Sequence, residues 1–206
     1  MSKFLFHILL PAMVLVGLAG TVGAEMPINT LFNGQTPSAC RAGMRVYESD
    51  RGKQLLGEVI QADFPRLLPG WDKEFEAYEP GAEDIVTLAQ VQEDISIICV
   101  LGTWCGDSER EVPRFWKILE DADNPHLELT MFAVGRSSDA QALAILDNIG
   151  FDEPLREIYG VQLVPTFIFM RGETELGRII ETPEGTLEQD AAQILSPKNA
   201  GEPAWH

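Results

Sequence analysis

The chain has 206 residues, with 32 acidic against 15 basic side chains and a formal net charge of −17. This excess of negative charge excludes nucleic acid as a partner and disfavours anionic lipid surfaces. The length and the 45% share of hydrophobic residues are sufficient for one domain with a sizeable core.

The first 24 residues have the pattern of a secretory signal peptide. Lys3 supplies a positive charge, residues 4–20 are largely apolar, and residues 22–24 are small enough for a cleavage site. We therefore expect an exported chain, periplasmic if the source is a Gram-negative bacterium, with no membrane contact after cleavage. The alternative is an uncleaved membrane anchor, but the apolar run is short for a span of about 20 residues.

Residues 25–82 give the weakest structural signal. One strand is expected within residues 40–47, and residues 64–78 have helical character that Pro69 and Gly70 interrupt. We interpret residues 25–82 as an N-terminal extension packed on the domain that follows.

Residues 83–196 alternate between helix and strand patterns. Helical spacing over 83–94 precedes the apolar run Ile95–Leu101, which has the length of a strand buried on both faces. The remaining expected elements are a helix with apolar positions 112, 115, 116 and 119, a strand at 127–134, a helix that ends at Gly150, a helical turn at 153–159, strands at 166–170 and 176–181, and a helix after a capping box of Thr186 and Gln189. This order predicts an α/β/α sandwich, with an antiparallel hairpin at one edge of a mixed central sheet and a polar tail at 197–206.

The strongest chemical signal is the sequence Trp-Cys-Gly-Asp-Ser at 104–108, between a predicted strand and a predicted helix. The unpaired N–H groups and the dipole of a helix start favour the thiolate of Cys105. Ser108 stands where a second cysteine would close a dithiol motif, so the site is suited to one-thiol chemistry. Ser108 either donates a hydrogen bond to that thiolate or only opens the helix. Asp107 favours the helix start but repels a thiolate beside it.

Two other cysteines are present, so an exported chain of this kind keeps at least one unpaired thiol. Cys99 lies within the apolar run and is expected to be a small buried hydrophobe. Cys40 lies in a polar segment and is a candidate resolving thiol, provided that its Cα is within about 7 Å of the Cα of Cys105. His126 has no partner at metal-ligand spacing, so we expect no metal and no cofactor.

These motifs resemble the thioredoxin family. The Trp-Cys-Gly sequence at 104–106 matches its signature, and Pro113 matches a helix-kinking proline eight residues after the cysteine. The Val-Pro-Thr sequence at 164–166 matches the loop whose proline is cis in that family and faces the cysteine. The resemblance implies a thioredoxin-like fold over residues 83–195. It also implies a substrate surface made by Trp104, Gly106, Asp107, Val164, Pro165 and Thr166.

Two departures from the family pattern matter for mechanism. Ser108 replaces the resolving cysteine, and Cys99 replaces a buried acid that moves protons during resolution. The resemblance therefore implies thiol–disulfide exchange by a monothiol mechanism, in which Cys105 forms a mixed disulfide with a protein or low-molecular-weight substrate.

Two other interpretations are compatible with the sequence. The chain could be a non-catalytic binding or chaperone-like module that keeps the fold without turnover. Alternatively, the Cys-Gly-x-Ser pattern at 105–108 is similar to that of monothiol glutaredoxins, which hold an iron–sulfur cluster with glutathione. Trp104 and the expected export count against this last interpretation, and slow alkylation of Cys105 would favour the binding module.

Overall fold

The structure is a computed structural model that describes residues 43–50, 52–148 and 159–196. The expected signal peptide at 1–24, Cys40, the polar tail and most of the expected turn at 153–159 lie outside the described residues.

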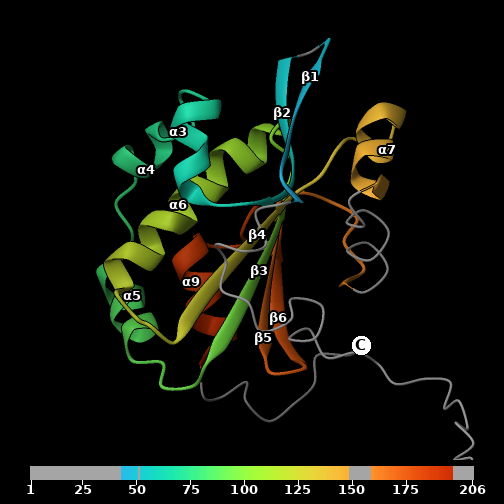
Figure 1. The fold of residues 1–206 in the computed structure, drawn as a ribbon. Coiled ribbons are helices and arrows are strands. Elements are labelled where there is room, and N and C mark those ends of the chain that lie inside the picture. The colour runs from blue at the N-terminus through green and yellow to red at the C-terminus, as the bar shows by residue number, and fades with distance from the viewer. Residues whose placement is uncertain (1–42, 51, 149–158, 197–206) are drawn as a thin grey trace, which may run out of the picture.

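A six-stranded mixed sheet forms the centre of the molecule, in the order β1-β2-β4-β3-β5-β6 (Figure 1). Strands β3 and β4 are parallel, and every other neighbouring pair is antiparallel. The strands are β1 (Arg45–Ser49), β2 (Gly52–Val59), β3 (Ile95–Leu101), β4 (Leu127–Ala133), β5 (Thr166–Arg171) and β6 (Thr174–Ile180). The mixed sheet and its edge hairpin β5–β6 confirm the prediction.

Helices cover both faces of this sheet, as an α/β/α sandwich requires (Figure 1). The described helices are η2 (Gln61–Asp63), α3 (Phe64–Leu67), α4 (Lys73–Ala77), α5 (Ala82–Ala89), α6 (Gly106–Ala122), α7 (Ala140–Asn148) and α9 (Leu187–Ile194). Helix α7 lies on one face, and α4, α5, α6 and α9 lie on the other. No helix in the described part of the chain combines the length and the apolar character needed to cross a lipid bilayer.

The sequence predicted one strand within residues 40–47, whereas the structure has the two strands of the hairpin β1–β2. The residues of β2 from Gln54 onward are buried on both faces, so the strand lacks the alternation that marks a half-exposed strand. Gly52 has a φ of 108° at the turn, a conformation that favours glycine. Strand β2 pairs with β4 through Gly57–Val59, so residues 45–59 extend the same sheet.

Strand β3 contributes side chains to the hydrophobic core on both faces of the sheet. Ile97, Cys99 and Leu101 face the cluster under α6, whereas Ile98 and Val100 face the cluster under α7. Cys99 is 0% exposed, which confirms the prediction of a small buried hydrophobe. Burial raises the pKa of its thiol, so Cys99 stays protonated and unreactive at neutral pH.

The last helix begins as predicted. The Thr186 hydroxyl accepts a hydrogen bond from the Gln189 N–H, and the Gln189 side chain accepts one from the Thr186 N–H. This reciprocal pair satisfies two backbone donors at the start of α9 and confirms the capping box.

A buried carboxylate joins α9 to the segment between α4 and α5. Glu188 is 3% exposed and accepts hydrogen bonds from the Tyr78 hydroxyl at 2.7 Å and the Gly81 N–H at 2.9 Å. Burial alone would raise the pKa of Glu188, but the hydrogen bonds outweigh it and lower the pKa below its ordinary value. The carboxylate therefore stabilises the fold above the unfolded pKa of about 4.3, and this contribution is lost as the pH falls through the folded pKa.

We expect Glu188→Gln to lower the free energy of unfolding by about 1 kcal/mol at pH 7, because a neutral amide accepts hydrogen bonds more weakly than a carboxylate. Urea unfolding at pH 7 and pH 3 measures this, and the gap between variant and wild type should narrow at pH 3. Glu76→Gln removes an exposed charge from α4 and serves as the matched control. A gap that stays constant with pH would contradict the assigned ionisation.

Candidate functional site

Cys105 lies where β3 ends and α6 begins. It is the N-cap of α6, with extended backbone, and its carbonyl accepts the Glu109 N–H at 3.0 Å. The thiol is partly exposed and donates to the Val164 carbonyl at 3.2 Å. The Val164–Pro165 peptide bond is cis. Because Val100 pairs with Thr166 across β3 and β5, the two sequence motifs meet at Cys105.

The rest of the Val-Pro-Thr segment supports this contact from inside the fold. Pro165 and Thr166 are buried, and the Thr166 hydroxyl donates to the Leu163 carbonyl at 2.7 Å. Val164 is partly exposed. Among these three predicted substrate contacts, Val164 therefore has the side chain most open to a ligand.

Ser108 stabilises the loop that precedes Cys105. Its side chain is 0% exposed, and its hydroxyl accepts the Gly102 N–H at 3.2 Å. Within the described residues, the Ser108 and Cys105 side chains form no hydrogen bond with each other. A Cβ on Gly102 would come within 2.7 Å of the Trp104 ring, so this close approach requires glycine. The hydrogen bond between Ser108 and Gly102 stabilises the loop, and any action of Ser108 on the Cys105 thiol remains a proposal.

Asp107 forms an ion pair within the first turns of α6. Its carboxylate accepts from Arg110 at 2.8 Å, and Arg110 also donates to Glu111 at 2.5 Å. The cation offsets the negative charge beside Cys105, so the repulsion expected from the sequence is reduced. Gly106 is exposed with open space around its Cα, which leaves room for a substrate next to Cys105.

Trp104 is held in place by two partners that follow β4. Its indole N–H donates to the Val134 carbonyl at 2.9 Å, and the Arg136 guanidinium lies 4.2 Å above its ring. Arg136 also donates to the Trp104 carbonyl at 3.1 Å. Sequence reasoning missed Arg136. Its signal was its place after a strand parallel to β3, because the carboxyl ends of parallel strands share one edge where ligands bind.

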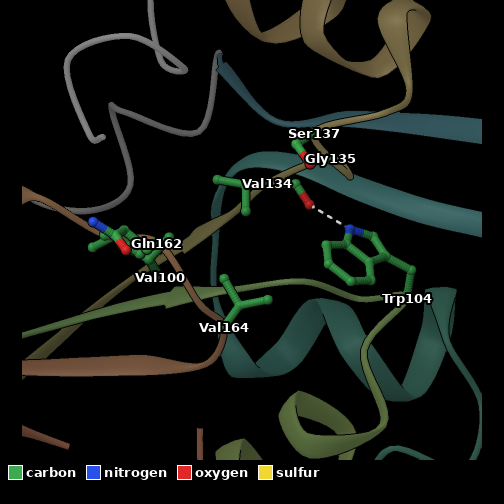
Figure 2. A pocket seen from close by; sticks show the side chains of 8 residues that line it. Val100, Trp104, Val134, Gly135, Ser137, Gln162 and Val164 are labelled. Carbon is green, nitrogen blue, oxygen red and sulfur yellow. Dashed lines mark hydrogen bonds between the residues drawn. The ribbon is translucent and has the colours of Figure 1, made fainter. Parts of the chain in front are cut away.

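A pocket of about 110 Å³ lies between the residue that precedes Cys105 and the residue whose carbonyl Cys105 contacts, although Cys105 itself does not line it. The Trp104 ring and the Val164 side chain border it (Figure 2). The lining residues are Val100, Trp104, Val134, Gly135, Ser137, Val161, Gln162 and Val164. The lining combines valine side chains with the polar groups of Ser137 and Gln162, which suits a small group with both apolar and polar parts.

Within the described residues, no group of three or more histidine, cysteine or acidic side chains is placed to hold a metal ion. Cys99 and Cys105 are both free thiols. Of these two thiols, Cys105 is partly exposed and Cys99 is buried.

No family model and no curated protein matches this sequence. Among solved structures, the chain is similar to a Pseudomonas aeruginosa protein of unknown function, with 19% identity, a TM-score of 0.40, and coverage of 64% of this chain and 70% of that one. It is also similar to Trxlp from Edwardsiella tarda (18%, 0.34, 56% and 95%) and to StoA from Bacillus subtilis (14%, 0.36, 50% and 84%). At such identities the likeness concerns the fold alone.

The order of elements defines the fold class. A parallel unit β3–α6–β4 is followed by the hairpin β5–β6 and the helix α9. The cysteine stands at the β3–α6 junction and the cis-proline directly before β5. The chain therefore has a thioredoxin-like fold.

Proposed function

We propose that the protein catalyses thiol–disulfide exchange through Cys105 alone. The observation that carries this proposal is the partly exposed thiol at the start of α6, in contact with the carbonyl before Pro165. The thiolate is the attacking form, and a helix start favours an anion. The open space at Gly106 leaves room for a disulfide to approach this sulfur.

The exchange takes place in two balanced steps. The Cys105 thiolate attacks one sulfur of a substrate disulfide, the new S–S bond forms, and the other sulfur leaves as a thiolate that takes a proton from solvent. A second thiol, from a low-molecular-weight compound or from a protein, then attacks the mixed disulfide and releases Cys105. The net result is an exchange of partners between one disulfide and one thiol. Cys40 is a further proposed resolving thiol, and an exported location is proposed from the pattern at residues 1–24.

Intact-mass spectrometry after incubation with oxidised glutathione tests the proposal. We expect one glutathione adduct, located on Cys105 by peptide mapping and removed by added thiol. Cys105→Ser should form no adduct at that position. An unmodified Cys105 under conditions that modify a simple thiol would contradict the proposal.

One observation favours the alternative of a non-catalytic binding module. Position 108 is a serine whose hydroxyl accepts the Gly102 N–H, and only a thiol resolves a mixed disulfide, so the motif itself offers no resolving group. Slow alkylation of Cys105 by iodoacetamide at pH 7, compared with glutathione under the same conditions, would favour that module over exchange.

A further inference from the structure

Arg136 differs from five of the other arginines of this acidic chain in having no carboxylate partner among the described residues. Five other arginines form ion pairs with acidic side chains, namely Arg66, Arg110, Arg114, Arg171 and Arg178. The partners given for Arg136 are the ring and the carbonyl of Trp104. In a chain with a net charge of −17, an arginine without an acidic partner beside a reactive thiol requires an explanation.

The guanidinium is fixed in orientation but incompletely hydrogen-bonded. Stacking on the Trp104 ring at 4.2 Å sets its plane, and the bond to the Trp104 carbonyl sets its rotation. That carbonyl belongs to the peptide bond that leads into Cys105. The Nε atom is buried and has no hydrogen-bond partner in the described part of the chain. Because this atom is closed to solvent, a ligand would contact the terminal nitrogens of this half-exposed side chain.

Arg136 lies next to the pocket without lining it. Gly135 and Ser137, its neighbours in the chain, both line the pocket, as do Trp104 and Val164 (Figure 2). Val164 also contacts the Cys105 thiol. Neither Arg136 nor Cys105 lines the pocket itself, but both adjoin Trp104, so a ligand that extends from the pocket past Trp104 would meet the guanidinium and the sulfur.

We propose that Arg136 binds the carboxylate of a low-molecular-weight disulfide while Cys105 attacks its sulfur. This inference rests on the proposed function and narrows its substrate to small disulfides that carry a carboxylate. The planar guanidinium donates two parallel hydrogen bonds to a carboxylate, which a lysine would not do. The local cation also offsets the repulsion that an anionic substrate meets from the rest of the chain.

The kinetic test compares two disulfides on the intact protein. Oxidised glutathione carries carboxylates, and bis(2-hydroxyethyl) disulfide carries none. We expect Arg136→Gln to slow the reaction of Cys105 with oxidised glutathione roughly tenfold, and with the neutral disulfide by less than about twofold. The same slowing with both disulfides, or with neither, would overturn the proposal.

Two variants complete the comparison. Arg171→Gln removes the same charge at the opposite end of β5 and should leave both rates unchanged. Arg136→Lys keeps the charge but loses the paired donors, so it should retain only part of the preference for oxidised glutathione. Equal preference in the lysine variant and the wild type would show a role of charge without the two-donor contact, and would overturn that contact.

A binding measurement separates this subsite from the exchange reaction. S-methylglutathione carries the carboxylates but cannot exchange, and the Trp104 indole N–H resonance reports on the pocket in Cys105→Ser protein. We expect a saturable shift that Arg136→Gln weakens roughly tenfold. If Cys105 reacts with no disulfide while this shift persists, the exchange function fails and the anion subsite stands. A shift unaffected by Arg136→Gln would overturn the subsite itself.

Discussion

Replacing Cys105 with alanine is expected to abolish disulfide exchange while the fold stays intact. The thiol is the proposed nucleophile, so its removal should lower the rate by at least about 100-fold. The side chain is partly exposed at a helix N-cap, and its contact is one hydrogen bond to Val164. The free energy of unfolding should therefore change by about 1 kcal/mol or less. Reduction of bis(2-hydroxyethyl) disulfide and urea unfolding measure the two effects.

The second described cysteine offers a matched control with the opposite outcome. Cys99 is fully buried under α6, so Cys99→Ala should leave the exchange rate unchanged and destabilise the fold by about 1 kcal/mol. If Cys105→Ala retained the activity, the nucleophile would be elsewhere. If Cys105→Ala destabilised the fold more than Cys99→Ala, its role would be structural.

The substitution Ser108→Cys should convert the site to a dithiol, although a slow one. Ser108 lies in the first turn of α6, so the new thiol would be within reach of a mixed disulfide on Cys105. Insulin reduction with limiting external thiol should rise at least about tenfold, because resolution becomes intramolecular. Sulfur accepts the Gly102 N–H less well than the serine hydroxyl, so some stability should be lost.

Ser108→Ala is the matched control, since it loses the same hydrogen bond without adding a thiol. It should show the stability loss and no gain in insulin reduction. No gain with Ser108→Cys would indicate that Cys105 is misplaced or blocked and would favour the binding module.

Adding Cys99→Asp to Ser108→Cys should raise the rate further, because the thioredoxin pattern that this sequence resembles has a buried acid at this strand position that moves protons for the second thiol. Position 99 is 0% exposed and sits in an apolar cluster, so the carboxyl group should cost roughly 2 kcal/mol or more of stability. A pH profile of insulin reduction compares the single and double variants. A double variant that folds but is no faster would contradict the proposed role of the acid.

The sequence by itself determined the elements that form around strong local patterns. The continuous apolar run Ile95–Leu101 could only be buried on both faces, and the structure makes it a central strand with cores on each side. The stripe that includes Phe115 and Trp116 predicted α6, and the Thr186 and Gln189 pair predicted the start of α9. Periodicity and capping act within a few residues, so they are visible without the fold.

The tertiary structure alone decided what lies across from those elements. Strand β2 was not predicted because its residues from Gln54 onward are buried on both faces, so they lack the alternation of buried and exposed positions that marks a half-exposed strand. Pairing across the sheet brought the carbonyl of Val164 onto Cys105, which proximity along the chain could not show. Arg136 lies over Trp104 because β3 and β4 are parallel neighbours, so that the segments following their carboxyl ends lie side by side. The sequence thus indicated the candidate nucleophile, and long-range strand pairing determined the groups that surround it.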